Sequence, residues 1–203
     1  MPRWMPDWSG ETCVIVASGP SAADVPLDLA KGKARCITIN SSWRLAPWAD
    51  MLFAADYRWW KSVNGCPEFT GIKATIDARA AREWGINRLH STNVNIMQLH
   101  RRGFIGWGGN SGFCALNLAA NLHCKRILLV GYDLRIDAGL HWHGPHGEGL
   151  RNPTEAKLGV WRKAIDSAAK ALAGAGIEVV NCSPVSALQS YKKKPFNEAL
   201  SDG

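Results

Sequence analysis

Short apolar runs recur along the chain, separated by segments with room for a helix or a loop. Six of them predict strands, at 12–17, 35–39, 51–55, 73–76, 126–130 and 178–181. Three are continuous β-branched or aliphatic runs, which is typical of strands covered on both faces. Strands that alternate with helical segments indicate an α/β fold.

Two segments between these strands predict helices. Residues 111–123 are apolar almost all round, which indicates a buried helix with Ser111 as its N-cap. Residues 153–173 carry one apolar face, with Asn152 as the cap and Gly174 at the end. Between the last two strands, 131–152 is rich in glycine and histidine and shows no periodicity, which is typical of a lid or binding loop.

The whole chain predicts one domain. Its 203 residues suffice for a full core, and 46% hydrophobic with 20% charged residues is a globular balance. We expect a single Rossmann-like domain with a doubly wound, mainly parallel sheet over about 11–190. A lid loop at 131–152 and a solvated basic tail at 191–203 complete this prediction.

Composition indicates where the protein is located and what kind of partner it binds. No apolar run reaches the roughly 18 residues of a membrane span, and the first residues lack a signal-peptide core, so we expect a cytoplasmic protein. The six cysteines form no C-x-x-C pair, and we expect them to be buried in a reducing compartment. The net charge of +7 favours an anionic partner such as a nucleotide, an acidic glycan or a nucleic acid.

Small polar residues follow five of the predicted strands, at the point where each strand ends. Parallel strands end at one edge of their sheet, and ligands of open α/β sheets bind at that edge. Any one of these residues also fits an ordinary loop start. As a set they predict a nucleotide pocket made of Ser18, Gly19, Pro20, Ser21, Asn40, Ser41, Ser42, Asp56, Tyr57, Tyr132, Asp133, Asn181, Ser183 and Ser186.

The loop after the first strand is the most informative of these segments. Gly19 lets the backbone approach a phosphate with no side chain between them, and turn N–H groups can surround an anion. The glycine spacing is that of neither a P-loop nor a G-x-G-x-x-G fingerprint. Asn110, Ser111 and Gly112 open a predicted helix, which fits a second anion site and an ordinary capped helix equally well.

Three of the six histidines, His141, His143 and His146, lie in the glycine-rich loop. One of them could be a general base, since imidazole titrates near neutral pH and can accept a proton from a hydroxyl. Alternatively, His141 and His143 bind a divalent metal with His146 or Asp133, or all three are surface histidines. The general base is favoured over the metal, because no H-E-x-x-H pattern or cysteine partner supports a metal site.

The order of these motifs resembles that of a known family. VIVASGPS, TINS and FAAD come first, SGFCAL and ILLVGYDL follow, and VVNCSPVSAL comes last. The pattern, which spans most of 12–190, is similar to the bacterial family 42 sialyltransferases. It is also similar to the related domain of 6-hydroxymethyl-dihydropterin pyrophosphokinases and motility accessory glycosyltransferases, and to short phage and prophage proteins.

This resemblance implies a Rossmann-like nucleotide site. Gly19, Ser21 and Asn40 would take the places of the family residues that hold the cytidine nucleotide, and Ser111 and Gly112 would line the same pocket. The implied donor is a CMP-linked sugar, and the implied acceptor is a small molecule or a glycan.

The resemblance also implies a catalytic lid with a histidine base, whose counterpart is His143 or His146. Tyr132 and Asp133, just before the lid, are further candidate catalytic residues. The chain departs from the family in two places. Ser18 stands where the family has an asparagine that helps to hold the nucleotide. The family's two lid tyrosines, which support the leaving phosphate, have no clear match: Tyr132 precedes Asp133, and His141 or His143 stands near the other place. These departures predict a relative with a different donor or acceptor.

The sequence therefore predicts a nucleotide-dependent transferase, most like a sialyl- or glycosyltransferase, in which Arg135 or Arg151 offsets charge on the leaving phosphate. Two alternatives stay open. One is pyrophosphoryl transfer from a Mg-nucleotide, with Asp56 and Asp133 near the metal. The other is a non-catalytic, phage-type module that binds nucleic acid or a protein partner through its basic surface.

Overall fold

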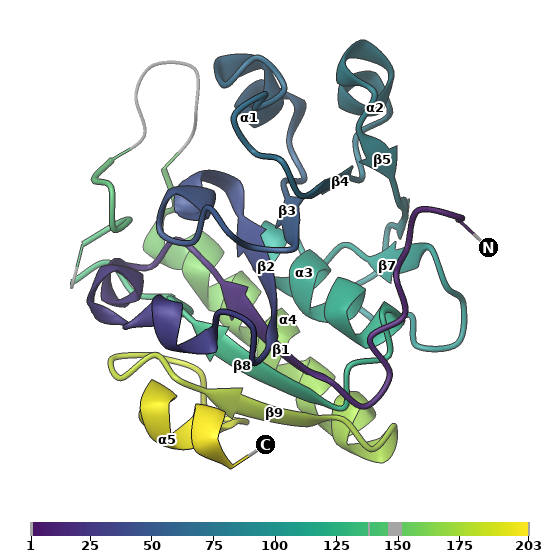
Figure 1. The fold of residues 1–203 in the computed structure, drawn as a ribbon. Coiled ribbons are helices and arrows are strands. Elements are labelled where there is room, and N and C mark those ends of the chain that lie inside the picture. Colours follow the sequence, from purple (N-terminus) through teal and green to yellow (C-terminus); the bar gives the residue numbers. More distant parts are fainter. Residues whose placement is uncertain (1, 138, 146–151, 203) are drawn as a thin grey trace.

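The computed structural model describes residues 2–137, 139–145 and 152–202 of the chain. Its centre is an eight-stranded sheet of order β10-β9-β8-β1-β2-β3-β4-β5, in which every neighbouring pair is parallel (Figure 1). The strands are β1 (Thr12–Val16), β2 (Arg35–Ile39), β3 (Met51–Phe53), β4 (Ile72–Thr75), β5 (Asn87–Arg88), β8 (Arg126–Val130), β9 (Glu178–Asn181) and β10 (Lys192–Lys193). The α/β fold with a Rossmann-like parallel sheet is confirmed.

The six predicted strands all form, with ends that differ by at most two residues. Those at 35–39, 126–130 and 178–181 match, whereas β1 and β3 end earlier than predicted and β4 begins one residue earlier. The sequence analysis missed β5 and β10, and it also missed a separate parallel pair, β6 (His90–Thr92) with β7 (Phe104–Gly106). These strands have only two or three residues, too few to leave an apolar pattern.

One face of the sheet packs on two long helices. Along β1, successive side chains point to opposite faces, and Cys13 and Ile15 join the core formed with α3 (Ser111–Asn121) and α4 (Glu155–Gly174). Nine of the eleven α3 residues are buried, which explains its nearly uniform apolarity.

The other face carries a second core. Val14 and Val16 of β1 pack there with side chains from short helices. These helices are α1 (Tyr57–Ser62), α2 (Ala78–Trp84) and α5 (Phe196–Ser201), together with the 3-10 helices η1 (Pro20–Asp24), η2 (Leu27–Ala30) and η3 (Asn40–Arg44). Helical segments on both faces make the sheet doubly wound, as predicted.

The N-caps of both long helices lie beside the predicted residues. Asn110, not Ser111, caps α3, and its Oδ1 accepts a hydrogen bond from Phe113 N at 2.9 Å. Thr154, not Asn152, caps α4, where its Oγ1 accepts from Lys157 N at 3.4 Å. Each helix is preceded by several residues able to cap it, and only the one with extended backbone directly before the first turn does so.

The C-terminal segment is not the predicted solvated tail. β10 pairs with β9, and α5 buries Phe196 and Ala199 against the sheet beside β9 (Figure 1). The side chains of Lys192 and Lys193 are nevertheless exposed, as expected of a lysine run. The apolar spacing of α5 was hidden by the charged residues before it.

Three further predictions bear on the structure. All six cysteines are free and buried, as expected. The described parts of the glycine-rich loop, 131–137 and 139–145, contain no helix or strand. Within the described residues, no helix has both the length and the apolar character needed to cross a bilayer.

Candidate active site

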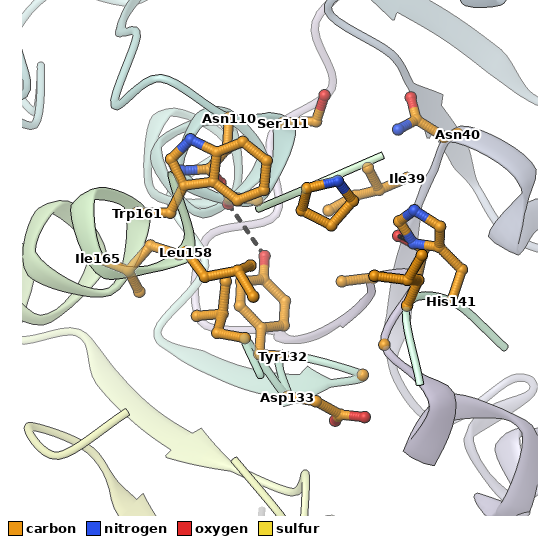
Figure 2. Close-up of a pocket in the computed structure, with 18 of the residues that line it drawn as sticks. Ile39, Asn40, Asn110, Ser111, Tyr132, Asp133, His141, Leu158, Trp161 and Ile165 are labelled. Carbon is orange, nitrogen blue, oxygen red and sulfur yellow. Dashed lines mark hydrogen bonds between the residues drawn. The ribbon is translucent and has the colours of Figure 1, made fainter. Parts of the chain in front are cut away.

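A cavity of about 210 Å³ opens at the carboxyl ends of β1, β2 and β8 (Figure 2). The chain passes from β1 to β2 on one side, while β8 pairs with β1 on the other, so this is the point where strand order reverses. Open α/β sheets bind their ligands at such a point. We call it the switch-point cavity; it is lined by 17–20, Ile39, Asn40, Asp56, 109–112, 131–135, Leu140, His141, Pro153, Leu158, Trp161 and Ile165.

The turn after β1 is clamped to the turn after β8. Gly19 N donates to Gly131 O at 2.9 Å, and a Cβ on Gly19 would lie 2.4 Å from that oxygen and 2.6 Å from Cγ of Asp133. Ser18, Gly19 and Pro20 line the cavity, as predicted. Glycine is thus required here because no side chain fits between the two turns.

Ser21 does not line the cavity, although it was predicted to bind the nucleotide. Its N–H donates to Asp133 Oδ2 at 2.8 Å, and its hydroxyl donates to Asp133 Oδ1. Asp133 is only 1% exposed. Asp133, a predicted catalytic residue, therefore lines the cavity, but both of its carboxylate oxygens hold the β1 turn in place.

Tyr132 forms part of the cavity wall and is also held by the protein itself. Its hydroxyl donates to Gly112 O at 3.0 Å, the bond drawn as a dashed line in Figure 2. Burial raises the pKa of the Tyr132 phenol well above its ordinary value, so the hydroxyl stays protonated near neutral pH. It therefore presents a neutral aromatic ring to the cavity.

The residues predicted after β9 support this wall from behind. Tyr132 N donates to Ser183 Oγ at 2.8 Å, and Ser186 Oγ donates to Tyr132 O at 2.6 Å. Asn181 Oδ1 in turn accepts from Ser183 N at 3.0 Å. None of the three lines the switch-point cavity. Asn181 ends β9, which lies two places from β1 in the sheet, and the two serines belong to the loop after it, which passes against the β8 turn.

Asn40 is the residue after β2 that reaches the cavity. Its φ of 51° places it in the left-handed region, which asparagine tolerates better than most residues and which is common at functional sites. Ser41 and Ser42 turn elsewhere: Ser41 Oγ accepts from Trp59 Nε1 at 3.3 Å, and Ser42 Oγ donates to Ala17 O at 3.0 Å. Neither serine lines the cavity.

Asp56 lines the cavity from the end of β3 and remains solvent-accessible. Desolvation by its surroundings raises the pKa of its carboxyl, the charge of Asp77 adds to this, and Arg58 opposes it. Tyr57 instead donates to Glu83 Oε2 at 2.8 Å and belongs to the α1–α2 surface. Asp56 is thus a carboxylate at the cavity that is easier to protonate than usual.

The first turn of α3 contributes backbone and small side chains. Gly109, Asn110, Ser111 and Gly112 all line the cavity, and Figure 2 shows the Asn110 and Ser111 side chains at one side of it. Backbone N–H groups at the start of an eleven-residue helix carry partial positive charge. This part of the cavity favours an anion.

Among the lid histidines that the structure describes, His141 lines the cavity. Its Nδ1 lies 3.2 Å from Ser18 Oγ, and the neighbouring Trp142 N–H donates to Ser18 O at 3.0 Å, so this segment is fastened to the β1 turn. His143 stacks on His141 with ring centroids 5.2 Å apart and does not line the cavity. His146 lies outside the described residues, as does Arg151.

One side of the cavity is apolar, and the sequence analysis did not predict it. Leu158, Trp161 and Ile165 from α4 project together toward Tyr132, whereas Asn40 and His141 lie across from them (Figure 2). Leu134, with a φ of 52°, also lines the cavity. These α4 positions follow the helical repeat, so in the sequence they cannot be told from the apolar face by which a helix packs on a core.

The predicted cation also lies at this site. Arg135 lines the cavity and pairs with Asp137. Within the part of the chain that the structure describes, no three His, Cys, Asp or Glu side chains come together to hold a metal ion.

No protein-family model matches the chain, and no curated protein is significantly similar to it.

Proposed function

We propose that this protein is a nucleotide-dependent transferase, most like a glycosyltransferase, that moves a sugar from a nucleotide donor to a hydroxyl acceptor. One observation carries the proposal. At the strand-order reversal, a single cavity combines a glycine turn without room for a side chain, a helix N-terminus and an aromatic wall. Phosphate, sugar and base each have a matching surface there.

The phosphate would bind between the Gly19 turn and the start of α3. The start of α3 offers backbone N–H groups, and Arg135 adds positive charge at the same cavity. The Gly19 turn forms the facing wall, but its Gly19 and Ser21 N–H groups already donate to Gly131 O and Asp133. The base would lie against Trp161, whose ring supplies a flat apolar surface. Asn40 would contact the donor from the opposite side. The net charge of +7 also favours an anionic donor.

Transfer would proceed by attack of the acceptor oxygen on the anomeric carbon of the sugar. The new glycosidic bond forms as the bond from that carbon to the phosphate oxygen breaks, and the electron pair leaves with the nucleotide. The acceptor proton passes to a lid histidine. His141 lines the cavity and is therefore the first to test, with His143 stacked on it and His146 as the other candidates.

A thermal-shift panel of CMP, CDP, UDP, GDP, ATP and S-adenosylmethionine, each with and without Mg²⁺, tests the nucleotide site. A nucleotide at one hundred times its Kd should stabilise the fold by about 2.7 kcal/mol and raise Tm by about 5–10 °C. We expect CMP to shift Tm without Mg²⁺. Trp161→Ala should weaken that binding at least tenfold, whereas Trp107→Ala, exposed and outside the cavity lining, should leave it unchanged.

Turnover separates the possible chemistries. With a CMP-sugar and a sugar acceptor, His141→Ala should reduce kcat far more than it changes CMP binding. If His143→Ala or H146A reduces kcat in this way and His141→Ala does not, the substituted histidine is the base instead. ATP consumption that depends strictly on Mg²⁺ would support pyrophosphoryl transfer. Binding of oligonucleotides that weakens steeply with salt, with no nucleotide shift, would overturn the transferase proposal.

A further inference from the structure

A serine and a histidine meet in the wall of the switch-point cavity. Ser18 Oγ lies 3.2 Å from His141 Nδ1, and both residues line the cavity. A nucleophile and its general base are joined over about 2.6–3.2 Å, so this separation is within reach. A serine hydroxyl is a weak nucleophile by itself, and a neighbouring imidazole activates it by taking its proton. The two side chains thus have the geometry of a nucleophile–base pair.

Ser18 occupies a place in the fold that exposes a nucleophile. It lies in the turn between β1 and η1, and β1 is an inner strand that pairs with β8 on one side and β2 on the other. A serine in a strand-to-helix turn at the carboxyl edge of a parallel sheet presents its hydroxyl above that edge, as the nucleophile of many hydrolases does. The neighbouring residues do not form the G-x-S-x-G pattern of those enzymes, so the likeness is one of position.

The imidazole of His141 is held against this hydroxyl. Its Nε2 is closed off from solvent, and its Nδ1 is the ring nitrogen that contacts Ser18. The ring stacks on His143 with centroids 5.2 Å apart, and the adjacent Trp142 N–H donates to Ser18 O at 3.0 Å. With its proton on Nε2, a neutral imidazole accepts a hydrogen bond at Nδ1. The base is therefore in place before any substrate binds.

The other cavity walls suit the two parts of an acyl group. Leu158, Trp161 and Ile165 form an apolar side, seen in Figure 2 across from the histidine, that fits an aliphatic or aromatic acyl chain. The first turn of α3 lines the same cavity, and N–H groups at a helix start favour the negative charge that develops on a carbonyl oxygen under attack. Both surfaces belong to the cavity that holds the Ser18–His141 pair.

We propose that Ser18 and His141 hydrolyse esters of small apolar acyl groups. Ser18 Oγ attacks the ester carbonyl carbon, and its proton passes to His141 Nδ1. The bond from that carbon to the alcohol oxygen then breaks, and the alcohol leaves with the proton. A water molecule, deprotonated by His141, attacks the acyl-serine and releases the carboxylic acid and the Ser18 hydroxyl. This activity needs no nucleotide and does not depend on the proposed transfer.

A fluorophosphonate probe tests the pair without the natural ester, because such probes react with activated serines. A bond forms between Ser18 Oγ and phosphorus as fluoride leaves, so the mass of the intact protein should rise by one adduct. Peptide mapping of the labelled wild-type protein should place the adduct on Ser18. The position of the label is thus read without any variant that has to fold.

Substitutions then test the roles of the two residues. His141→Gln removes the base and should slow labelling at least about one hundredfold. His100→Gln is the matched control, because His100 is exposed and outside the cavity lining, and it should be labelled at the wild-type rate. Ser18→Ala should abolish hydrolysis of p-nitrophenyl butyrate, whereas Ser41→Ala, also outside the lining, should retain it. Far-UV circular dichroism checks that each variant folds.

Two results would overturn the proposal: a wild-type protein whose Ser18 stays unlabelled, and a His141→Gln variant labelled at the wild-type rate. A CMP titration run alongside keeps this outcome distinct from that of the proposed function. If CMP raises Tm and Ser18 stays unlabelled, ester hydrolysis alone fails. If Ser18 is labelled and no nucleotide binds, the transferase alone fails.

Discussion

Gly19 offers the sharpest test of how the switch-point cavity is built. Its backbone φ of −59° is available to any residue, so alanine at this position meets no conformational penalty. The penalty is purely steric. The added Cβ would lie 2.4 Å from Gly131 O and 2.6 Å from Asp133 Cγ, closer than real Cβ contacts come. The carbonyl is backbone, and the carboxylate is fixed by two hydrogen bonds from Ser21.

The neighbours of Gly19 cannot yield cheaply. Inserting a carbon into a packed site costs about 1–3 kcal/mol, and contact with backbone puts Gly19→Ala at the upper end, about 2–3 kcal/mol. Gly159 in α4 gives the matched control, because a Cβ there meets only Arg162 Nη2 at 3.7 Å. Gly159→Ala should stabilise the protein by about 0.5–1 kcal/mol through helix propensity.

Urea denaturation followed by circular dichroism measures the free energy of unfolding of both variants. In a thermal melt, Gly19→Ala should lower Tm by about 5–10 °C, and Gly159→Ala should raise it by about 2–4 °C. Nucleotide binding should be lost in the first variant, because its turn must move, and retained in the second. A Gly19→Ala protein as stable as the wild type would refute the steric account of this turn.

Two further substitutions probe buried polar groups. Ser21→Ala removes a charge-assisted hydrogen bond to buried Asp133 and should lower the free energy of unfolding, measured with urea, by about 1.5–3 kcal/mol. Ser9→Ala is the control, because it removes the same kind of bond to exposed Asp7. It should change the free energy of unfolding by less than about 0.5 kcal/mol. Cys182, with its pKa raised from 9.0 to about 12, stabilises the fold fully below pH 9 and progressively less above it, because the thiol ionises only in the unfolded chain. Urea titrations from pH 8 to 11 should therefore show stability falling more steeply in the wild type than in Cys182→Ala, by up to about 1.4 kcal/mol per pH unit; equal slopes would contradict this.

The long elements could be predicted from sequence because their patterns follow directly from burial. β8 is buried on both faces and reads as a continuous aliphatic run, while α3 is buried almost all round and reads as apolar throughout. The short β10 and the helix after it left no such pattern. Two lysines form that strand. They pair with β9 through their backbones, so their charged side chains give no sign of a strand.

The site could be predicted in position but not in detail. The rule that ligands bind at strand carboxyl ends located the cavity through Gly19 and Asn40. It could not say which way a side chain points, and so the predicted set included Ser21, Ser183 and Asn181, which do not line the cavity. Whether a serine faces a cavity or a neighbouring backbone depends on local packing that one sequence does not reveal.

The structure separates the residues that make the motif recognisable from those that form the cavity surface. Ser21, Asp133, Ser183 and Ser186 hydrogen-bond to the protein itself and fix the turns after β1 and β8. Any chain that keeps them keeps the turn geometry, whatever ligand it binds. Ligand choice must then depend on the side chains that face the cavity, above all Trp161 and its neighbours on α4. Because those positions follow the ordinary helical repeat, they can change without disturbing the motif, and the motif alone therefore cannot specify a ligand.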